Sequence, residues 1–90
     1  MTDELTGIPN RRAFLMALDQ ALLSARTASL LIVDLDRFKE VNDRYGHVAG
    51  DRLLRHTAKV FAEEVPCGAF LSRLGGDEFA VLLTDADTAG

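Results

Sequence analysis

Two adjacent glycines followed by two carboxylates are the part of this 90-residue chain best suited to chemistry. The stretch reads Gly75-Gly76-Asp77-Glu78-Phe79, and apolar runs flank it on both sides. Glycine reaches the positive φ angles of tight turns, so the pattern predicts a hairpin with Gly-Gly at its turn. Such a lean turn lets an anionic ligand approach the backbone, and carboxylates on its rim suit Mg²⁺ beside phosphates. A surface hairpin with solvated acids explains the same string, and both interpretations stay open at this point.

A second set of polar residues runs from Asp34 to Asp51. Asp34 ends an apolar run that predicts a buried strand, and ligands in open α/β sheets bind at the carboxyl ends of strands. A buried carboxylate is costly unless it is paired or bound to a metal. The segment lacks the Gly at position six and the Glu at position twelve of an EF-hand loop, and the chain has no P-loop. Helix capping is the alternative role for Asn42 and Asp51.

Composition restricts the kind of protein. Hydrophobic residues make up 48% of the chain, which is enough for a core. No apolar run approaches the roughly 18 residues of a membrane span, and the first residues are not typical of a signal peptide. The net charge is −4 without any Lys/Arg block, so a nucleic-acid partner is not expected. The single Cys67 excludes an internal disulfide and suits a reducing compartment, so we expect a cytoplasmic domain.

The elements that must position these residues alternate between helix and strand. We expect a helix from the N-cap Asn10 to about Arg26, a strand over 29–35, a short helix over 38–44, a helix from Gly50-Asp51 to about Glu64, and the two hairpin strands. The buried faces of the two long helices are expected at Phe14, Leu18, Ala21, Leu22 and Ala25, and at Leu53, Leu54, Thr57, Val60 and Phe61. This order predicts an α/β fold with a mixed sheet.

Together, three motifs resemble the GGDEF domain of diguanylate cyclases. Residues 3–12 are similar to the family's D-x-L-T-G-L-x-N-R-R, residues 34–51 to D-x-D-x-F-K-x-x-N-D-x-x-G-H-x-x-G-D, and residues 73–79 to R-x-G-G-D-E-F. The resemblance implies an α+β sandwich whose mixed sheet is related to the ferredoxin-like palm of nucleotidyl cyclases. It also implies that 1–90 is a partial domain, without the helices and strands of the C-terminal half.

The resemblance further implies a reaction and a set of site residues. Such domains act as homodimers that join two GTP molecules into cyclic di-GMP, with release of pyrophosphate, using Mg²⁺ or Mn²⁺. The implied metal ligands are Asp34, the carbonyl of Leu35, Asp77 and Glu78, and Asp77 would also assist deprotonation of the attacking hydroxyl. By the same resemblance, Asn42 and Asp51 would bind guanine, and Phe38 would line the base pocket. Lys39 would contact the phosphates, and Gly75 and Gly76 would leave room for the α-phosphate. His47 matches a position that contacts the substrate.

One segment of the chain departs from the family's pattern. The chain has Pro-Cys-Gly-Ala at 66–69, where many members carry an inhibitory R-x-x-D site, so we expect no product inhibition there.

The alternative to a catalytic domain is a non-catalytic GTP-binding module beside a phosphodiesterase domain, and the intact acidic residues argue against it. A purely structural or dimerisation role is the third hypothesis for the isolated piece, which is expected to lack activity and to self-associate through the strand of Leu30–Val33.

Overall fold

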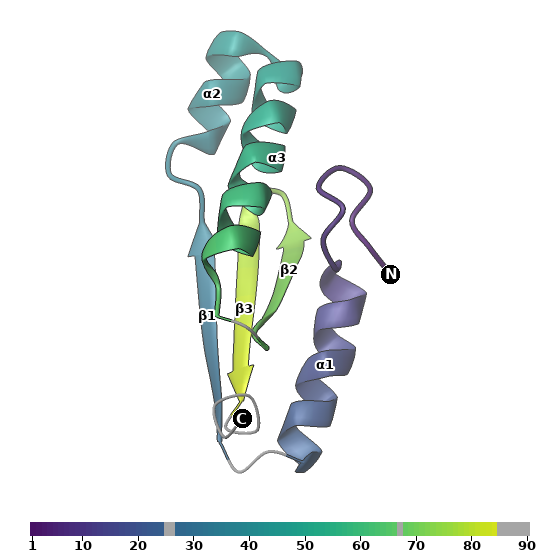
Figure 1. Ribbon diagram of the computed structural model, residues 1–90. Coiled ribbons are helices and arrows are strands. Elements are labelled where there is room, and N and C mark those ends of the chain that lie inside the picture. Colours follow the sequence, from purple (N-terminus) through teal and green to yellow (C-terminus); the bar gives the residue numbers. More distant parts are fainter. Residues whose placement is uncertain (25–26, 67, 85–90) are drawn as a thin grey trace.

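The structure, a computed structural model, describes residues 1–24, 27–66 and 68–84. Its elements are, in order, α1 (Arg11–Ser24), β1 (Ala28–Asp34), α2 (Phe38–Tyr45), α3 (His47–Glu64), β2 (Phe70–Gly75) and β3 (Glu78–Thr84) (Figure 1). The predicted α/β class and element order are confirmed. Three residues that entered the sequence predictions, Ala25, Arg26 and Cys67, lie outside the described ranges.

The three strands form one sheet in the order β1-β3-β2. Both neighbouring pairs are antiparallel. The hairpin of β2 and β3 was predicted, whereas the pairing of β1 with β3 joins segments that the two helices α2 and α3 separate in the sequence. A mixed sheet would require a parallel pair as well, and the described strands form none.

Alternate residues of the central strand β3 contribute to two separate cores. Ala80 and Leu82 pack with Phe14 of α1. Phe79, which is fully buried, packs with Leu54 of α3. Because successive residues of a strand point to opposite faces of a sheet, α1 and α3 cover opposite faces. The sheet is therefore the middle layer, and its hairpin end lies beside both cores.

Helix α1 begins at its predicted cap. The Ala13 N–H donates to the Asn10 Oδ1 at 2.9 Å, which is the expected N-cap bond. The buried face is narrower than predicted: Phe14 and Ala21 are buried, but Leu22 is 67% exposed. The helix contacts mainly β2, at one edge of the sheet, so only the residues in line with that strand are covered.

Strand β1 lies at an edge of the described sheet, as expected for residues 1–90 on their own, although the apolar run by itself predicted a buried strand. Leu30, Leu31 and Ile32 are 46%, 58% and 52% exposed. Apolar residues on both faces are typical of central strands. In the described part of the chain, however, β1 pairs only with β3 and contributes to neither buried cluster.

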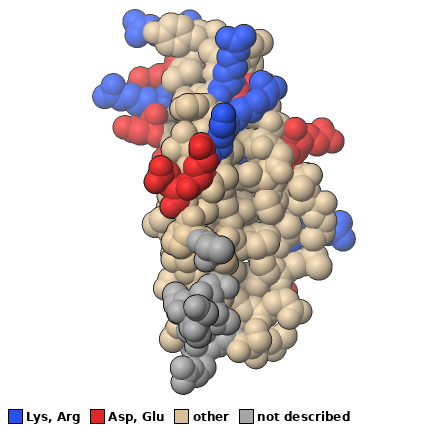
Figure 2. All heavy atoms as spheres, in the orientation of Figure 1, with Lys and Arg blue, Asp and Glu red and all other residues tan. Residues whose placement is uncertain are grey.

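Charged side chains cover much of the face that carries α2 and α3. Figure 2 shows them over the upper half of this face, whereas most of the drawn, non-grey atoms of the lower half are uncharged. Among the described helices, none has the length and apolar character needed to cross a membrane.

Candidate functional site

The hairpin turn is built on two glycines with positive φ. Gly75 has φ 147° and Gly76 has φ 49°, and the strand register shifts between Arg73 and Gly75. The predicted reason for the glycines is confirmed, since residues with a side chain rarely adopt these angles. A Cβ added at either glycine would meet no described atom within 4 Å, so the space beside the turn is open. A ligand can therefore approach this backbone closely.

The end of β1 lies against this turn. Asp34 is the cross-strand partner of Glu78, and the Leu35 N–H donates to the Asp77 carbonyl at 3.2 Å. Residues directly opposite each other in an antiparallel pair have Cβ atoms about 5 Å apart on one face. The fold therefore brings together the four positions predicted as metal ligands, which are Asp34, Leu35, Asp77 and Glu78. Their individual roles stay predictions.

The chemistry of these donors fits a hard divalent cation. Asp34 is exposed, in contrast to the predicted buried carboxylate, and Glu78 is partly buried; their like charges in directly opposite positions repel each other, and a cation bound between them would offset this repulsion. Mg²⁺ is bound by one or two carboxylates and completes its shell with water and phosphate oxygens. Within the described residues, no group of three or more His, Cys, Asp or Glu side chains could hold a metal by itself. The donor set fits Mg²⁺ shared with a substrate's phosphates.

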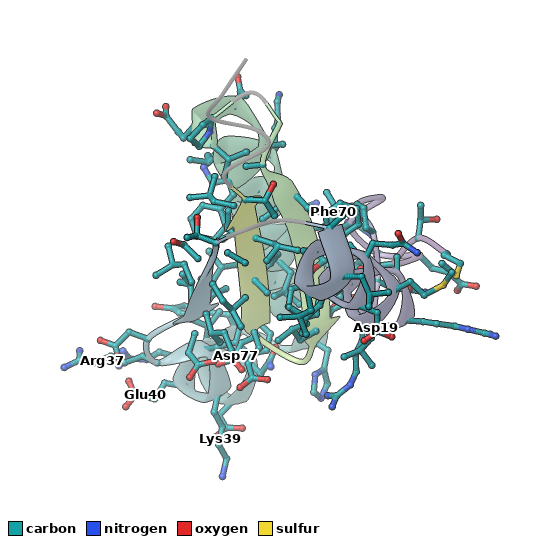
Figure 3. All side chains as sticks on the ribbon, turned by 90° about the horizontal axis from the view of Figure 1, so that it is seen from below. Asp19, Arg37, Lys39, Glu40, Phe70 and Asp77 are labelled. Carbon is teal, nitrogen blue, oxygen red and sulfur yellow. The ribbon has the colours of Figure 1, made fainter. Side chains whose placement is uncertain are left out.

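Helix α2 begins beside the same end of the sheet. Arg37, its N-cap residue, has φ 60° and ψ 25° and is the described chain's one non-glycine residue with positive φ. No side chain caps the helix, so its first N–H groups are available to an anion. Figure 3 shows Arg37 and Lys39 extending outward from α2, near the turn that carries Asp77. Phe38 is partly buried against the core cluster of Phe79, so its predicted contact with a base is limited to its exposed part.

The two residues predicted to recognise guanine lie on neighbouring helices. Asn42 is inside α2 and Asp51 is inside α3, so the alternative that they are helix caps is wrong. A Cβ on Gly50 would overlap the Asn42 Oδ1, so the Asn42 side chain lies directly against the α3 backbone, one residue before Asp51. Both side chains are partly buried, while His47, the first residue of α3, is exposed.

The N-terminal residues fold into a loop that docks beside the hairpin. Thr2 and Pro9 form an isolated bridge, and the Arg73 N–H of β2 donates to the Pro9 carbonyl at 2.9 Å. Figure 1 shows this loop next to the turn end of β2. The Arg73 side chain makes a second link, because its Nη1 lies 3.0 Å from both Asp3 carboxylate oxygens.

Asp3 is held in its charged form. Burial raises the pKa of the Asp3 carboxyl, but hydrogen bonds from the Thr6 hydroxyl and N–H and from Arg73, together with the Arg73 charge, outweigh burial and lower the pKa below its ordinary value. From the sequence we assigned Asp3 and Arg73 no role in the site. Their positions in the first and third motifs were the signal that marked them.

Comparison with known proteins identifies the family to which this chain belongs. Residues 1–90 match the family described as "Diguanylate cyclase, GGDEF domain". The chain is 43% identical over 90 residues to the signaling protein YkoW of Bacillus subtilis (strain 168), covering 96% of the chain and 11% of that protein. It is 46% identical over 85 residues to the diguanylate cyclase TpbB of Pseudomonas aeruginosa PAO1, covering 90% of the chain and 20% of TpbB.

Solved structures agree with the sequence relatives. The GGDEF domain of DgcB from Caulobacter crescentus, in complex with c-di-GMP, superimposes with a TM-score of 0.87 at 39% identity, over 92% of this chain and 49% of that one. A TpbB structure comprising only the GGDEF domain gives 0.85 at 43% identity, over 98% and 56%. The chain thus spans about half of these solved chains and a fifth or less of those two curated relatives. Because the family model matches residues 1–90, and the solved GGDEF domains share its fold, this chain belongs to the diguanylate cyclase GGDEF domain family.

Proposed function

We propose that the protein carrying this chain condenses two GTP molecules into cyclic di-GMP and releases pyrophosphate. The observation that carries the proposal is the register that sets Asp34 opposite Glu78, with Leu35 bonded to Asp77 at the open Gly-Gly turn. The acids that the family needs for nucleotide chemistry thereby meet at one end of the sheet. Relatives named diguanylate cyclases support the same reaction.

In this proposal, Mg²⁺ or Mn²⁺, when bound, would neutralise triphosphate charge and lower the pKa of the attacking hydroxyl. Asp34, the Leu35 carbonyl, Asp77 and Glu78 would hold the metal, and Asp77 would accept the proton of the 3′-hydroxyl. The open space at Gly75 and Gly76 would admit the α-phosphate.

Residues of α2 and α3 would hold the rest of the nucleotide. The Asn42 amide can donate a hydrogen bond to guanine, and the Asp51 carboxylate can accept one from it. The two residues lie at adjacent positions of α2 and α3. The uncapped start of α2, with Lys39 beside it, would contact phosphates, and Phe38 and His47 would contact the base or its surroundings. Each 3′-hydroxyl has to attack the α-phosphate of the other GTP, so two domains must face each other as a homodimer. A cytoplasmic location, where GTP is available, is part of the proposal.

A non-catalytic GTP-binding module is the alternative. Such a module would need the guanine-binding helices but no acidic pair beside the turn. The juxtaposition of Asp34 and Glu78 supports catalysis, because two carboxylates in facing positions beside the turn suit a divalent cation, which binding of GTP alone would not require.

The test is conversion of GTP by the full-length protein with Mg²⁺, followed by chromatography for cyclic di-GMP and pyrophosphate. We expect Asp77→Ala to abolish conversion, because loss of a metal ligand and proton acceptor removes several kcal/mol of transition-state stabilisation, about a thousandfold in rate or more. Asp19→Ala is the matched control, since Asp19 is exposed on α1 (Figure 3). Undiminished turnover in Asp77→Ala would contradict the role of Asp77, and wild-type binding of GTP without turnover would favour the alternative.

A further inference from the structure

The Arg73 guanidinium uses all three of its nitrogens to join the N-terminal loop to the hairpin turn. Its Nη1 donates to both carboxylate oxygens of Asp3, each at 3.0 Å. Its Nε and Nη2 donate to the Gly76 carbonyl at 3.1 and 2.8 Å. The side chains of Arg73 and Asp3 are 14% and 20% exposed, and the bonds to the Gly76 carbonyl lie at the surface of the molecule.

The bond to the Gly76 carbonyl determines the direction of the next peptide group. A trans peptide is planar with its C=O and N–H antiparallel, so a carbonyl held by Arg73 directs the Asp77 N–H away from Arg73. The carbonyl of Asp77 is held in turn by the Leu35 N–H at 3.2 Å. Both peptide groups that flank Asp77 are therefore restrained, one from β2 and one from the end of β1.

Without these bonds the turn would have unusual freedom. Gly75 and Gly76 have no side chains to limit their backbone angles, and no described atom packs within 4 Å of where a Cβ would be. A group that works on a reacting atom must be held closely, because a displacement of about 1 Å can cost on the order of a hundredfold in rate. The openness that admits a ligand also removes the packing that would fix Asp77.

We propose that Arg73 is a positioning residue, which holds the Gly76–Asp77 peptide and the Asp3 carboxylate at once and so fixes Asp77 for reaction. The proposal rests on the proposed function for the step that Asp77 performs. A single partly exposed ion pair adds little to stability. We therefore expect loss of the bonds made by Arg73 to lower the turnover rate, because the turn that carries Asp77 would no longer be held in one orientation.

The test compares Arg73→Lys and Asp3→Asn in the full-length protein with the matched controls Arg55→Lys and Asp19→Asn, which alter exposed residues of α3 and α1. A lysine has one point charge and cannot bridge a carboxylate and a carbonyl in a fixed plane. We expect Arg73→Lys to lower kcat about tenfold to a hundredfold. We expect KM for GTP to change by less than about threefold, since the guanine contacts are intact. Asp3→Asn should lower kcat less, because the bonds to Gly76 persist.

A second measurement separates this proposal from the proposed function. Amide exchange at Leu35, whose N–H donates to the Asp77 carbonyl of the turn, can be followed by NMR; it should accelerate in Arg73→Lys and Asp3→Asn and stay unchanged in the controls. This readout decides the proposal even if the wild-type protein makes no cyclic di-GMP, and Asp3→Asn decides it if Arg73→Lys does not fold. Unchanged exchange at Leu35 would overturn the proposal, as would a rise in KM with unchanged kcat.

Discussion

Because Gly50 has no side chain, the side chain of Asn42 can lie directly against the backbone of α3. The Asn42 Oδ1 occupies the space that a Cβ on Gly50 would fill, so the two helices α2 and α3 meet closely at this point. Helix α3 begins at His47, three residues earlier than we predicted, directly after Gly46, whose φ of 90° separates it from α2. We interpreted Gly50 as the start of the helix, but it lies inside the helix and makes room for a neighbour.

This contact gives a prediction about nucleotide selectivity. Asn42→Ala should lower the preference for GTP over ATP about tenfold or more, because the guanine edge loses a hydrogen-bond partner. Gly50→Ala should act in the same direction, since the new methyl group displaces the Asn42 side chain. The double variant Asn42→Ala/Gly50→Ala should be no less selective than Asn42→Ala alone. Competition binding of GTP and ATP measures all three, and an unchanged GTP preference in Asn42→Ala would show that Asn42 does not read the base.

The lowered pKa of Asp3 predicts how stability depends on pH. The folded-state pKa lies below the ordinary 3.8, so the stabilisation by Asp3 is fully present above that value and is lost as the pH falls through the folded-state pKa. Urea unfolding from about pH 6 down to about pH 3 should therefore show wild type and Asp3→Asn converging in free energy of unfolding at the acid end. A gap between them that stays constant over this range would contradict the prediction.

At the scale of elements, the sequence predicted those features that depend on residues close together in the chain. The Asn10 cap and the Gly-Gly turn were found because each depends on residues within four positions of one another. The apolar run of β1 predicted burial because it reports only the two faces of the strand, whereas the exposed edge was expected from the resemblance to the family. The narrow buried face of α1 was missed because the position of the helix at one sheet edge decides how many residues it covers.

The exposed edge of β1 predicts association of the chain 1–90 on its own. Leu31 is 58% exposed on a strand whose described partner is β3 alone, and such edges pair with other chains. Light scattering should show growth in mass as the concentration rises from about micromolar to about millimolar. Leu31→Lys should reduce this growth, since lysine on an edge strand opposes pairing.

A matched variant tests whether the edge or another apolar surface is responsible. Leu23 on α1 is 84% exposed, so Leu23→Lys adds the same charge on an exposed apolar residue outside β1. We expect Leu23→Lys to associate like the wild type. A monomer at about millimolar concentration, or rescue by Leu23→Lys alone, would contradict association through β1.

At the scale of the whole molecule, the site depends on contacts between distant parts of the sequence. Asp3 and Arg73 are 70 residues apart, and their pairing cannot be read from either motif alone. The motifs showed which residues matter, and the resemblance to a family supplied their implied roles. The sheet register then showed that Asp34 faces Glu78, a relation that no spacing rule within one segment contains.

The strand order β1-β3-β2 also has a consequence for how the chain is made. The ribosome releases β1 first, and the partner that covers one of its edges, β3, is the last described element to emerge. Synthesis proceeds at about 5–20 residues per second, whereas a hairpin such as β2–β3 closes within about 1–10 μs. The nascent chain therefore carries an apolar strand without this neighbour for seconds. Chaperones that bind extended apolar segments have that interval in which to act, and Asp34 meets Glu78 only after β3 has emerged.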